Sequence, residues 1–238
     1  MQIKYSNILN LDKSLGKAAV FIAFVSINNY KQEAVQLISK IADNSWLNQL
    51  DEIAQISFQT KVENTANKMI EIFRNVQSTN QIKSDFGEYL ISLKSQEYLE
   101  QEHNHKQIPL SELWKEKVSG NGGFDFHTES PTAYITFGEA KYRSGKNVNA
   151  YKAASEQIVQ FISPEQRKDL GDILLLQNLD VSQASIDNLK IGKRSFAAGF
   201  SLHSTDYMLI ETKIMNEPSI QNLIQTAEEL YIIGFEIC

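Results

Sequence analysis

The sequence predicts an α/β protein. A mainly helical N-terminal region is expected to come first, followed by a mixed sheet that helices flank. Apolar residues recur at helical spacing through much of residues 1–80, which indicates a mainly helical N-terminal region. From Pro109 onward the apolar segments become short and glycine separates them, as is typical of strands. Helical spacing returns in residues 147–162, and further short apolar segments follow. We therefore expect a sheet core built mainly from the second half of the chain.

The N-terminal region is expected to contain helical segments in residues 37–53 and 62–73, with breaks at Asn44-Ser45 and at residues 57–60. Thr60 followed by Glu63 fits a capping box at the start of the second helix. Asp85 fits the N-cap of a further helix.

The second half is expected to form most of the strands. Residues 110–117 fit either a strand or a helical turn, and Glu129-Ser130-Pro131 fits a turn between two strands. The expected strands are residues 124–128, 134–143, 173–176, 196–203 and 230–237, with helices at residues 147–162 and 220–229.

Length and composition are those of a globular protein. The chain has 238 residues and is 42% hydrophobic, which suffices for a sizeable core. We expect a helical N-terminal region at residues 1–80 and a core at residues 81–238, or else one continuous domain. The sequence does not fix the oligomeric state.

Charge and cysteine content limit the cellular setting. The formal net charge is −6, so binding to DNA requires a local basic patch or a partner. The only cysteine is Cys238, which fits a reducing compartment. No secretory signal is recognisable, and the longest apolar run, residues 18–27, is half the roughly 20 residues of a membrane span. We expect a cytoplasmic protein without membrane contact.

The chemically most informative segment is residues 120–145, in which Asp125 precedes Glu139-Ala140-Lys141 by 14 positions. Alternation along a strand puts Glu139 and Lys141 on one face. If residues 124–128 pair with this strand, Asp125 lies near Glu139. Two carboxylates are suitable ligands for Mg²⁺, or Mn²⁺ in its place, and Lys141 can stabilise charge on a phosphate. The segment therefore predicts a metal-dependent phosphodiesterase.

The tripeptide pattern alone is weak, because Glu211-Thr212-Lys213 repeats it behind Asp206. The gap between Asp206 and Glu211 is too short for a hairpin, so we expect a solvated surface pair there. The turn, the glycines and the following helix distinguish the first copy.

This arrangement resembles the PD-(D/E)xK restriction-endonuclease-like superfamily, which implies a mixed-sheet nuclease core. Asp125 matches the first acid of the motif, Glu139 the second and Lys141 the lysine. Glu88 matches the acid that members often carry on a preceding helix, as a further metal ligand. Gln157 is similar to a glutamine that some members place beside the metal. The chain departs from the pattern in lacking a proline before Asp125.

Within this superfamily, residues 85–165 are similar to the HamA nuclease subunits of Hachiman antiphage defence. The similarity rests on Phe86-Gly87-Glu88, Gly123-Phe124-Asp125 and residues 137–141. It implies DNA degradation in antiviral defence, together with a helicase partner.

Residues around the proposed site suggest further roles. Arg143, Lys146 and Lys152 form the best nucleic-acid-binding patch, because they adjoin the motif. His127 shares the Asp125 face, where a hydrogen-bonded buried histidine is the ordinary alternative to a supporting catalytic role. His103 and His105 lie in a polar stretch and are expected to be loop residues.

Two alternatives to a DNA nuclease stay open from the sequence. One is a non-catalytic subunit that keeps the nuclease fold and binds a partner protein. The other is a ribonuclease of the same fold. Cleavage specificity, endonuclease against exonuclease action and the restraint of activity are not predicted.

Overall fold

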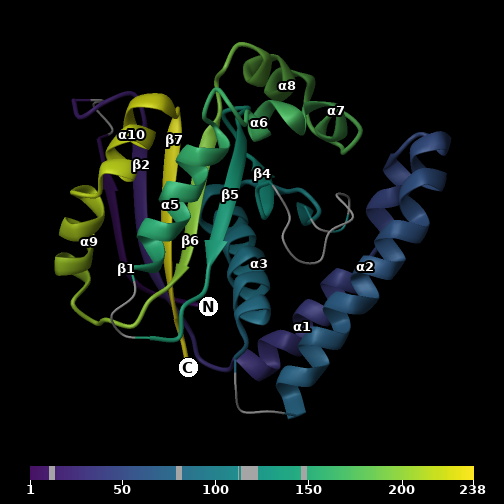
Figure 1. The fold of residues 1–238 in the computed structure, drawn as a ribbon, viewed down its shortest axis with the longest axis horizontal. Coiled ribbons are helices and arrows are strands. Elements are labelled where there is room, and N and C mark those ends of the chain that lie inside the picture. The colour runs from purple at the N-terminus through teal and green to yellow at the C-terminus, as the bar shows by residue number, and fades with distance from the viewer. Residues whose placement is uncertain (11–13, 79–81, 112, 114–122, 146–148) are drawn as a thin grey trace.

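The structure is a computed structural model, which describes residues 1–10, 14–78, 82–111, 113, 123–145 and 149–238. In these ranges seven strands form one mixed sheet, in the order β1-β2-β7-β6-β5-β4-β3 (Figure 1). The α/β fold with a mixed sheet and flanking helices is thereby confirmed. The strands are β1 (Gln2–Leu9), β2 (Ala19–Ile27), β3 (Lys106–Gln107), β4 (Phe126–Glu129), β5 (Ile135–Lys141), β6 (Ser195–Ser201) and β7 (Glu229–Ile237).

The centre of the sheet is parallel. β2, β7, β6 and β5 run side by side in one direction, while β1 and β4 pair antiparallel at either side and β3 pairs antiparallel with β4. Every residue of β6 is buried, as expected for a parallel strand covered on both faces. The carboxyl ends of the parallel strands therefore share one edge of the sheet, which is where α/β proteins commonly bind ligands.

Helices cover both faces of this sheet (Figure 1). Phe200 in β6 packs its ring against Tyr151 of α5 on one face. The neighbouring Gly199 faces α3, where an added Cβ would lie 2.5 Å from the Ser95 hydroxyl. The helices are α1 (Tyr30–Ala42), η1 (Ser45–Gln49, a 3₁₀ turn), α2 (Glu52–Ser78), α3 (Ser84–His103), α5 (Ala150–Phe161), α6 (Lys168–Gly171), α7 (Ile173–Leu176), α8 (Gln183–Lys190), α9 (Tyr207–Met215) and α10 (Pro218–Thr226).

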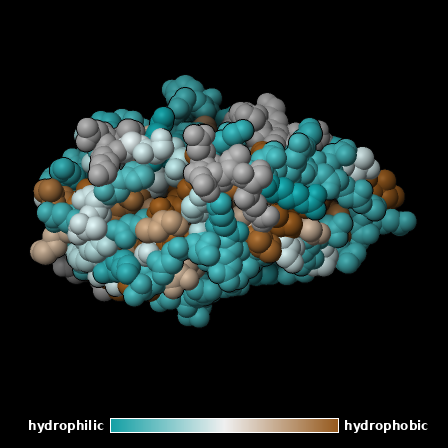
Figure 2. Space-filling view, turned by 90° about the horizontal axis from the view of Figure 1, so that it is seen from below, coloured by the Kyte–Doolittle hydropathy of each residue, from teal (hydrophilic) through white to brown (hydrophobic). Residues whose placement is uncertain are grey.

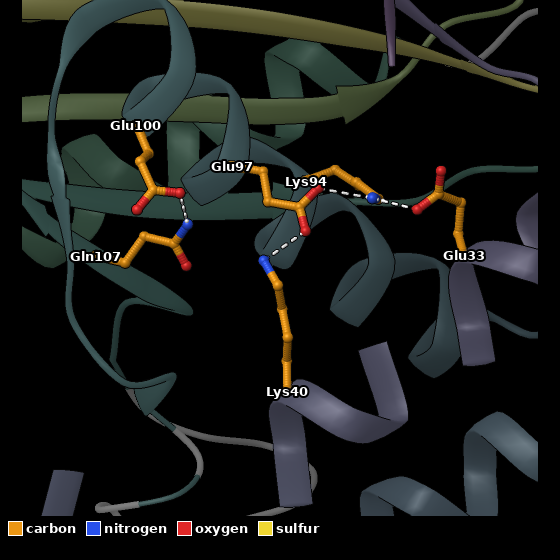
Figure 3. A network of polar contacts seen from close by, with 6 residues as sticks. All are labelled: Glu33, Lys40, Lys94, Glu97, Glu100 and Gln107. Atoms are coloured by element: carbon orange, nitrogen blue, oxygen red, sulfur yellow. Dashed lines mark hydrogen bonds and ion pairs between the residues drawn. The ribbon is translucent and has the colours of Figure 1, made fainter. Parts of the chain in front are cut away.

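An ionic network joins α1 to α3 (Figure 3). Lys94 of α3 is only 3% exposed and forms ion pairs with Glu33 of α1 and with Glu97, the latter at 2.6 Å. Glu97 in turn pairs with Lys40 of α1 at 2.6 Å. Because the buried ammonium has two carboxylate partners, its desolvation is offset, and the contact ties the helical N-terminal segment to the core.

The helices predicted for residues 1–80 are confirmed from residue 30 onward, as α1, η1 and α2, whereas the first 27 residues contain β1 and β2. The sheet thus takes strands from both sides of residue 80. β2 is a continuous apolar run that lies between two neighbouring strands. The sequence of such a run does not alternate, so its pattern does not distinguish a strand from a helix.

Smaller elements also differ from prediction. Residues 173–176 form the single-turn helix α7 rather than a strand. Thr60 lies inside the 27-residue helix α2, so the predicted break and capping box are absent there. Residues 114–117, within the predicted 110–117 element, lie outside the described residues. Among the helices that the structure describes, none is long and apolar enough to cross a membrane.

Candidate active site

The β4–β5 hairpin places the predicted site residues on adjacent strands, as the sequence indicated. The strands pair antiparallel with Phe126 opposite Gly138, and Ser130 closes the turn by a 2.9 Å bond from its amide to the Tyr134 carbonyl. The ladder continues one residue before β4, since the Asp125 amide donates to the Gly138 carbonyl at 2.9 Å. Asp125 is therefore brought beside Glu139.

A side-chain contact then fixes the Asp125 carboxylate. Its Oδ2 accepts a 2.8 Å hydrogen bond from the backbone amide of Ala140. Gly138 allows the strands to fit closely here, because an added Cβ would lie 2.2 Å from the Phe126 ring. The carboxylate is thus held by the strand that contains the second acid.

Glu139 and Lys141 point to the same face of β5 and form a buried ion pair. Lys141 Nζ lies 2.6 Å from Glu139 Oε1, with side-chain exposures of 15% and 0%. The other oxygen, Glu139 Oε2, is buried and has no hydrogen-bond partner among the described residues. A buried carboxylate oxygen without a donor is costly, so this atom is poised for a positively charged ligand.

Glu88 enters the cluster from the first turn of α3. The backbone amide of Tyr142, directly after β5, donates a hydrogen bond to its carboxylate. Gly87 makes the approach possible, since a Cβ at this residue would lie 2.2 Å from the Tyr142 ring. The start of α3 and the carboxyl end of β5 therefore pack directly on each other. Glu88 thereby brings a third carboxylate close to the Glu139–Lys141 ion pair.

The three acids and the lysine lie within electrostatic reach of one another. Burial raises the pKa of Glu139 well above its usual value, and the charge of Asp125 raises it further against the opposing effect of Lys141. Burial likewise raises the pKa of Glu88, with Lys141 opposing and Asp125 adding to the shift. The site holds more negative charge than its single lysine balances.

Lys141 responds in the opposite way. Burial alone would lower the pKa of Lys141, but the charges of Glu139, Asp125 and Glu88 outweigh it and raise the pKa above its usual value. The side chain is therefore an ammonium at neutral pH and can stabilise an anion, while it cannot accept a proton.

The other predicted residues have different outcomes. Gln157 is half-buried on α5, and no hydrogen bond joins it to the described site residues. Arg143 is exposed, and its backbone amide donates to Ser201 Oγ at 2.8 Å. Lys152 pairs with Glu217 at 3.5 Å and with Glu156 at 3.7 Å. Lys146 lies outside the described residues.

His127 has the structural environment that was weighed against a catalytic role. It is wholly buried, with Nδ1 3.0 Å from Ser111 Oγ and Nε2 3.5 Å from Asp172. The expectation of loop residues is wrong for His103, which ends α3, and right for His105, which lies between α3 and β3 and is buried with hydrogen bonds to Thr128 and Tyr231. These histidines hold elements together.

The second Glu-x-Lys copy lies on a helix rather than a strand. Glu211 of α9 accepts hydrogen bonds from the Tyr5 hydroxyl at 2.7 Å and from Asn7 at 3.1 Å. It thereby attaches α9 to β1, so it is not a simple solvated pair.

The acids do not form a ready-made three-ligand metal site. Among the described residues, no group of three His, Cys, Asp or Glu side chains has the spacing to hold an ion. The sequence reasoning missed Gly87 and Tyr142 as the contact that brings Glu88 in. A glycine in the first turn of a helix was the signal available for it.

Comparison with models of known protein families finds no match to this chain. Comparison with curated proteins likewise finds none.

Proposed function

We propose that this protein is a metal-dependent nuclease that hydrolyses phosphodiester bonds in DNA. The observation that supports it best is the convergence of Asp125, Glu139 and Lys141 at the hairpin, with Glu88 arriving from α3. A carboxylate-rich centre with one buried lysine is costly to maintain and has no evident structural purpose.

The residues present fit a divalent cation. Asp125 and Glu139 would hold it and Glu88 would join them, since burial and, after it, the charge of Asp125 raise the pKa of Glu139 and of Glu88, and a bound cation would offset both effects. Mg²⁺ binds proteins through one or two carboxylates plus waters and substrate phosphate, so it does not require three preassembled ligands. Bound there, Mg²⁺ or Mn²⁺ would supply an activated water and neutralise phosphate charge.

The protein's own groups have separate tasks in this proposal. The Asp125 carboxylate is oriented by the Ala140 amide, so one of its oxygens is already committed to the backbone. The Lys141 ammonium lies beside Glu139 and can hydrogen-bond a phosphate oxygen whose charge grows during attack. Burial of Glu139 keeps bulk water from the ion pair and strengthens these interactions.

The biological setting is the part of the proposal that rests on resemblance. The motif resembles that of restriction-endonuclease-like nucleases, and residues 85–165 resemble the HamA subunits of Hachiman defence. We propose accordingly that the protein acts on DNA in the cytoplasm, in antiviral defence, with a helicase partner. Its net charge of −6 favours such a partner, because the chain as a whole repels DNA.

The test is a cleavage assay with plasmid, linear DNA and RNA in Mg²⁺, for the protein alone and with its genomic neighbour. Glu139→Gln and Lys141→Ala are expected to lower the rate at least about a hundredfold, the usual effect of losing one catalytic electrostatic group. Glu211→Gln is the matched control for the acid, because it changes the other Glu-x-Lys copy. Lys190→Ala on α8, at the opposite end of the strands, is the control for the lysine (Figure 1).

Each outcome decides between the candidates. Cutting that persists in both site variants refutes the site assignment. Cutting of RNA in preference to DNA favours the ribonuclease. No cutting on any substrate, with or without the neighbour, favours a non-catalytic subunit.

A further inference from the structure

A cavity of about 320 Å³ lies at the same edge of the sheet as the candidate active site. Its walls come from the end of β6, the start of α5 and one side of α9. This volume is at the lower end of the range for small-molecule sites, about 300–1,000 Å³, and accommodates one nucleotide rather than a protein segment. The lining residues are Asn149, Ala150, Tyr151, Phe200, Ser201, Leu202, His203, Ser204, Leu209, Ile210 and Lys213.

Hydrogen bonds connect this cavity directly to the active-site strand. Phe200 is the register partner of Lys141 in the parallel β5–β6 pair. Two residues beyond Lys141, the Arg143 amide donates to Ser201 Oγ, and its carbonyl accepts from Ser201 and from His203 Nε2. The same backbone segment thus leads from the catalytic lysine to the cavity wall.

The charge of the cavity is opposite to that of the protein. Its described lining includes the cationic Lys213 but no carboxylate, in a chain whose net charge is −6. The nearby acids have other partners, since Glu211 accepts from Tyr5 and Glu217 pairs with Lys152. Lys213 is exposed, and its ammonium is available to an anion that enters the cavity.

The remaining lining suits the other parts of a nucleotide. Ser204 offers a hydroxyl group, while Tyr151, Phe200 and Ile210 offer ring and aliphatic surface. The first amides of α5 add a weaker positive potential on the same wall. Seen from the end to which the parallel strands point, the molecule's surface is mostly hydrophilic, with smaller hydrophobic patches (Figure 2).

We propose that this cavity binds the phosphomonoester of a nucleotide, next to the catalytic centre. A phosphomonoester has nearly two negative charges at neutral pH, against one for a phosphodiester, so the Lys213 ammonium attracts it more strongly. On the proposed nuclease function, the phosphate belongs to the end of a DNA strand, and the enzyme prefers phosphorylated ends. A free mononucleotide contains the same group, and binding experiments separate the two sources.

The test measures binding without cleavage. A fluorescent single-stranded oligonucleotide with a 5′-phosphate, a 3′-phosphate or no terminal phosphate is titrated in the absence of added metal, and thymidine monophosphate is titrated as competitor. The wild-type protein is expected to bind one phosphorylated form about tenfold more tightly than the unphosphorylated one, equivalent to about 1.4 kcal/mol. Lys213→Ala should abolish the preference and Lys213→Arg retain it, while Lys190→Ala leaves it unchanged.

The outcomes separate this inference from the proposed function. If the phosphorylated oligonucleotide binds more tightly than thymidine monophosphate, the cavity is assigned to a strand end. If these two ligands bind equally tightly, it is assigned to a free nucleotide. Equal binding of all three oligonucleotides by the wild-type protein, or an unchanged preference in Lys213→Ala, overturns the inference. Because no metal is added, these results stand whether or not the cleavage assay succeeds.

Discussion

Replacing Glu139 with glutamine should make the folded protein more stable while removing the proposed nuclease activity. The substitution removes one negative charge and preserves the shape of the side chain. In the structure Glu139 is wholly buried, one of its oxygens has no donor among the described residues, and burial raises its pKa well above the usual value. Ionised Glu139 therefore lowers the free energy of unfolding. Glutamine has no charge and avoids this loss of stability.

The size of the effect follows from what glutamine keeps and loses. Its amide oxygen can still accept from Lys141 Nζ, which lies 2.6 Å from Glu139 Oε1. Relief of a strained catalytic group commonly adds about 0.5–2 kcal/mol, and we expect about 1 kcal/mol near neutral pH. For a chain of 238 residues this corresponds to a rise in Tm of about 2–4 °C.

The pH dependence has a definite sign. An acid whose pKa is raised on folding lowers the stability of the folded state once the pH exceeds its unfolded-state pKa, because the folded protein binds the proton more tightly than the unfolded chain does. The cost is absent below the ordinary Glu value of 4.5 and grows as the pH rises to the raised pKa. The difference in Tm between Glu139→Gln and wild type should therefore vanish toward pH 4.5.

The assay is thermal unfolding followed by circular dichroism over a pH series from about 4.5 to 8. Glu211→Gln serves as a control for which the expected change in Tm has the opposite sign. Its carboxylate accepts from Tyr5 and Asn7, so glutamine should cost about 1 kcal/mol. A lower Tm for Glu139→Gln at the alkaline end, or a shift independent of pH, would refute the reasoning and make the Glu139–Lys141 pair a structural one.

Three further predictions concern stability. Lys94→Met should lower the free energy of unfolding in urea by about 3 kcal/mol, because it leaves two carboxylates without their buried cationic partner. A decrease of less than about 1 kcal/mol contradicts this. Gly138→Ala should cost about 2 kcal/mol by collision with the Phe126 ring, whereas Gly171→Ala, with open space around its Cβ, should be close to neutral in the same melts. Burial lowers the pKa of His105 to about 3, so stability should fall as the pH drops from 6.5 toward 3, and His105→Gln should flatten that fall in denaturant titrations.

The hairpin at the active site was predictable because its signals are local. Short apolar runs, a Ser-Pro turn and a following amphipathic helix all lie within about forty residues of chain, where strand alternation determines which side chains share a face. Asp125, Glu139 and Lys141 are accordingly adjacent in the structure. The edge and central strands before residue 28 had no comparable signal, since β2 is apolar at nearly every position.

The sequence alone determined the α/β class, the β4–β5 hairpin and the pairing of its two acids and lysine, because these depend on residue spacing along one short segment. Only the tertiary structure decided which Glu-x-Lys copy lies on a strand, how Gly87 lets Glu88 reach the cluster, and that β1 and β2 complete the sheet. It also created the cavity beside Lys213, whose walls are separated by up to 64 positions between Asn149 and Lys213. Such features arise when segments distant in the sequence pack against each other, and the local periodicity of the sequence does not predict these long-range contacts.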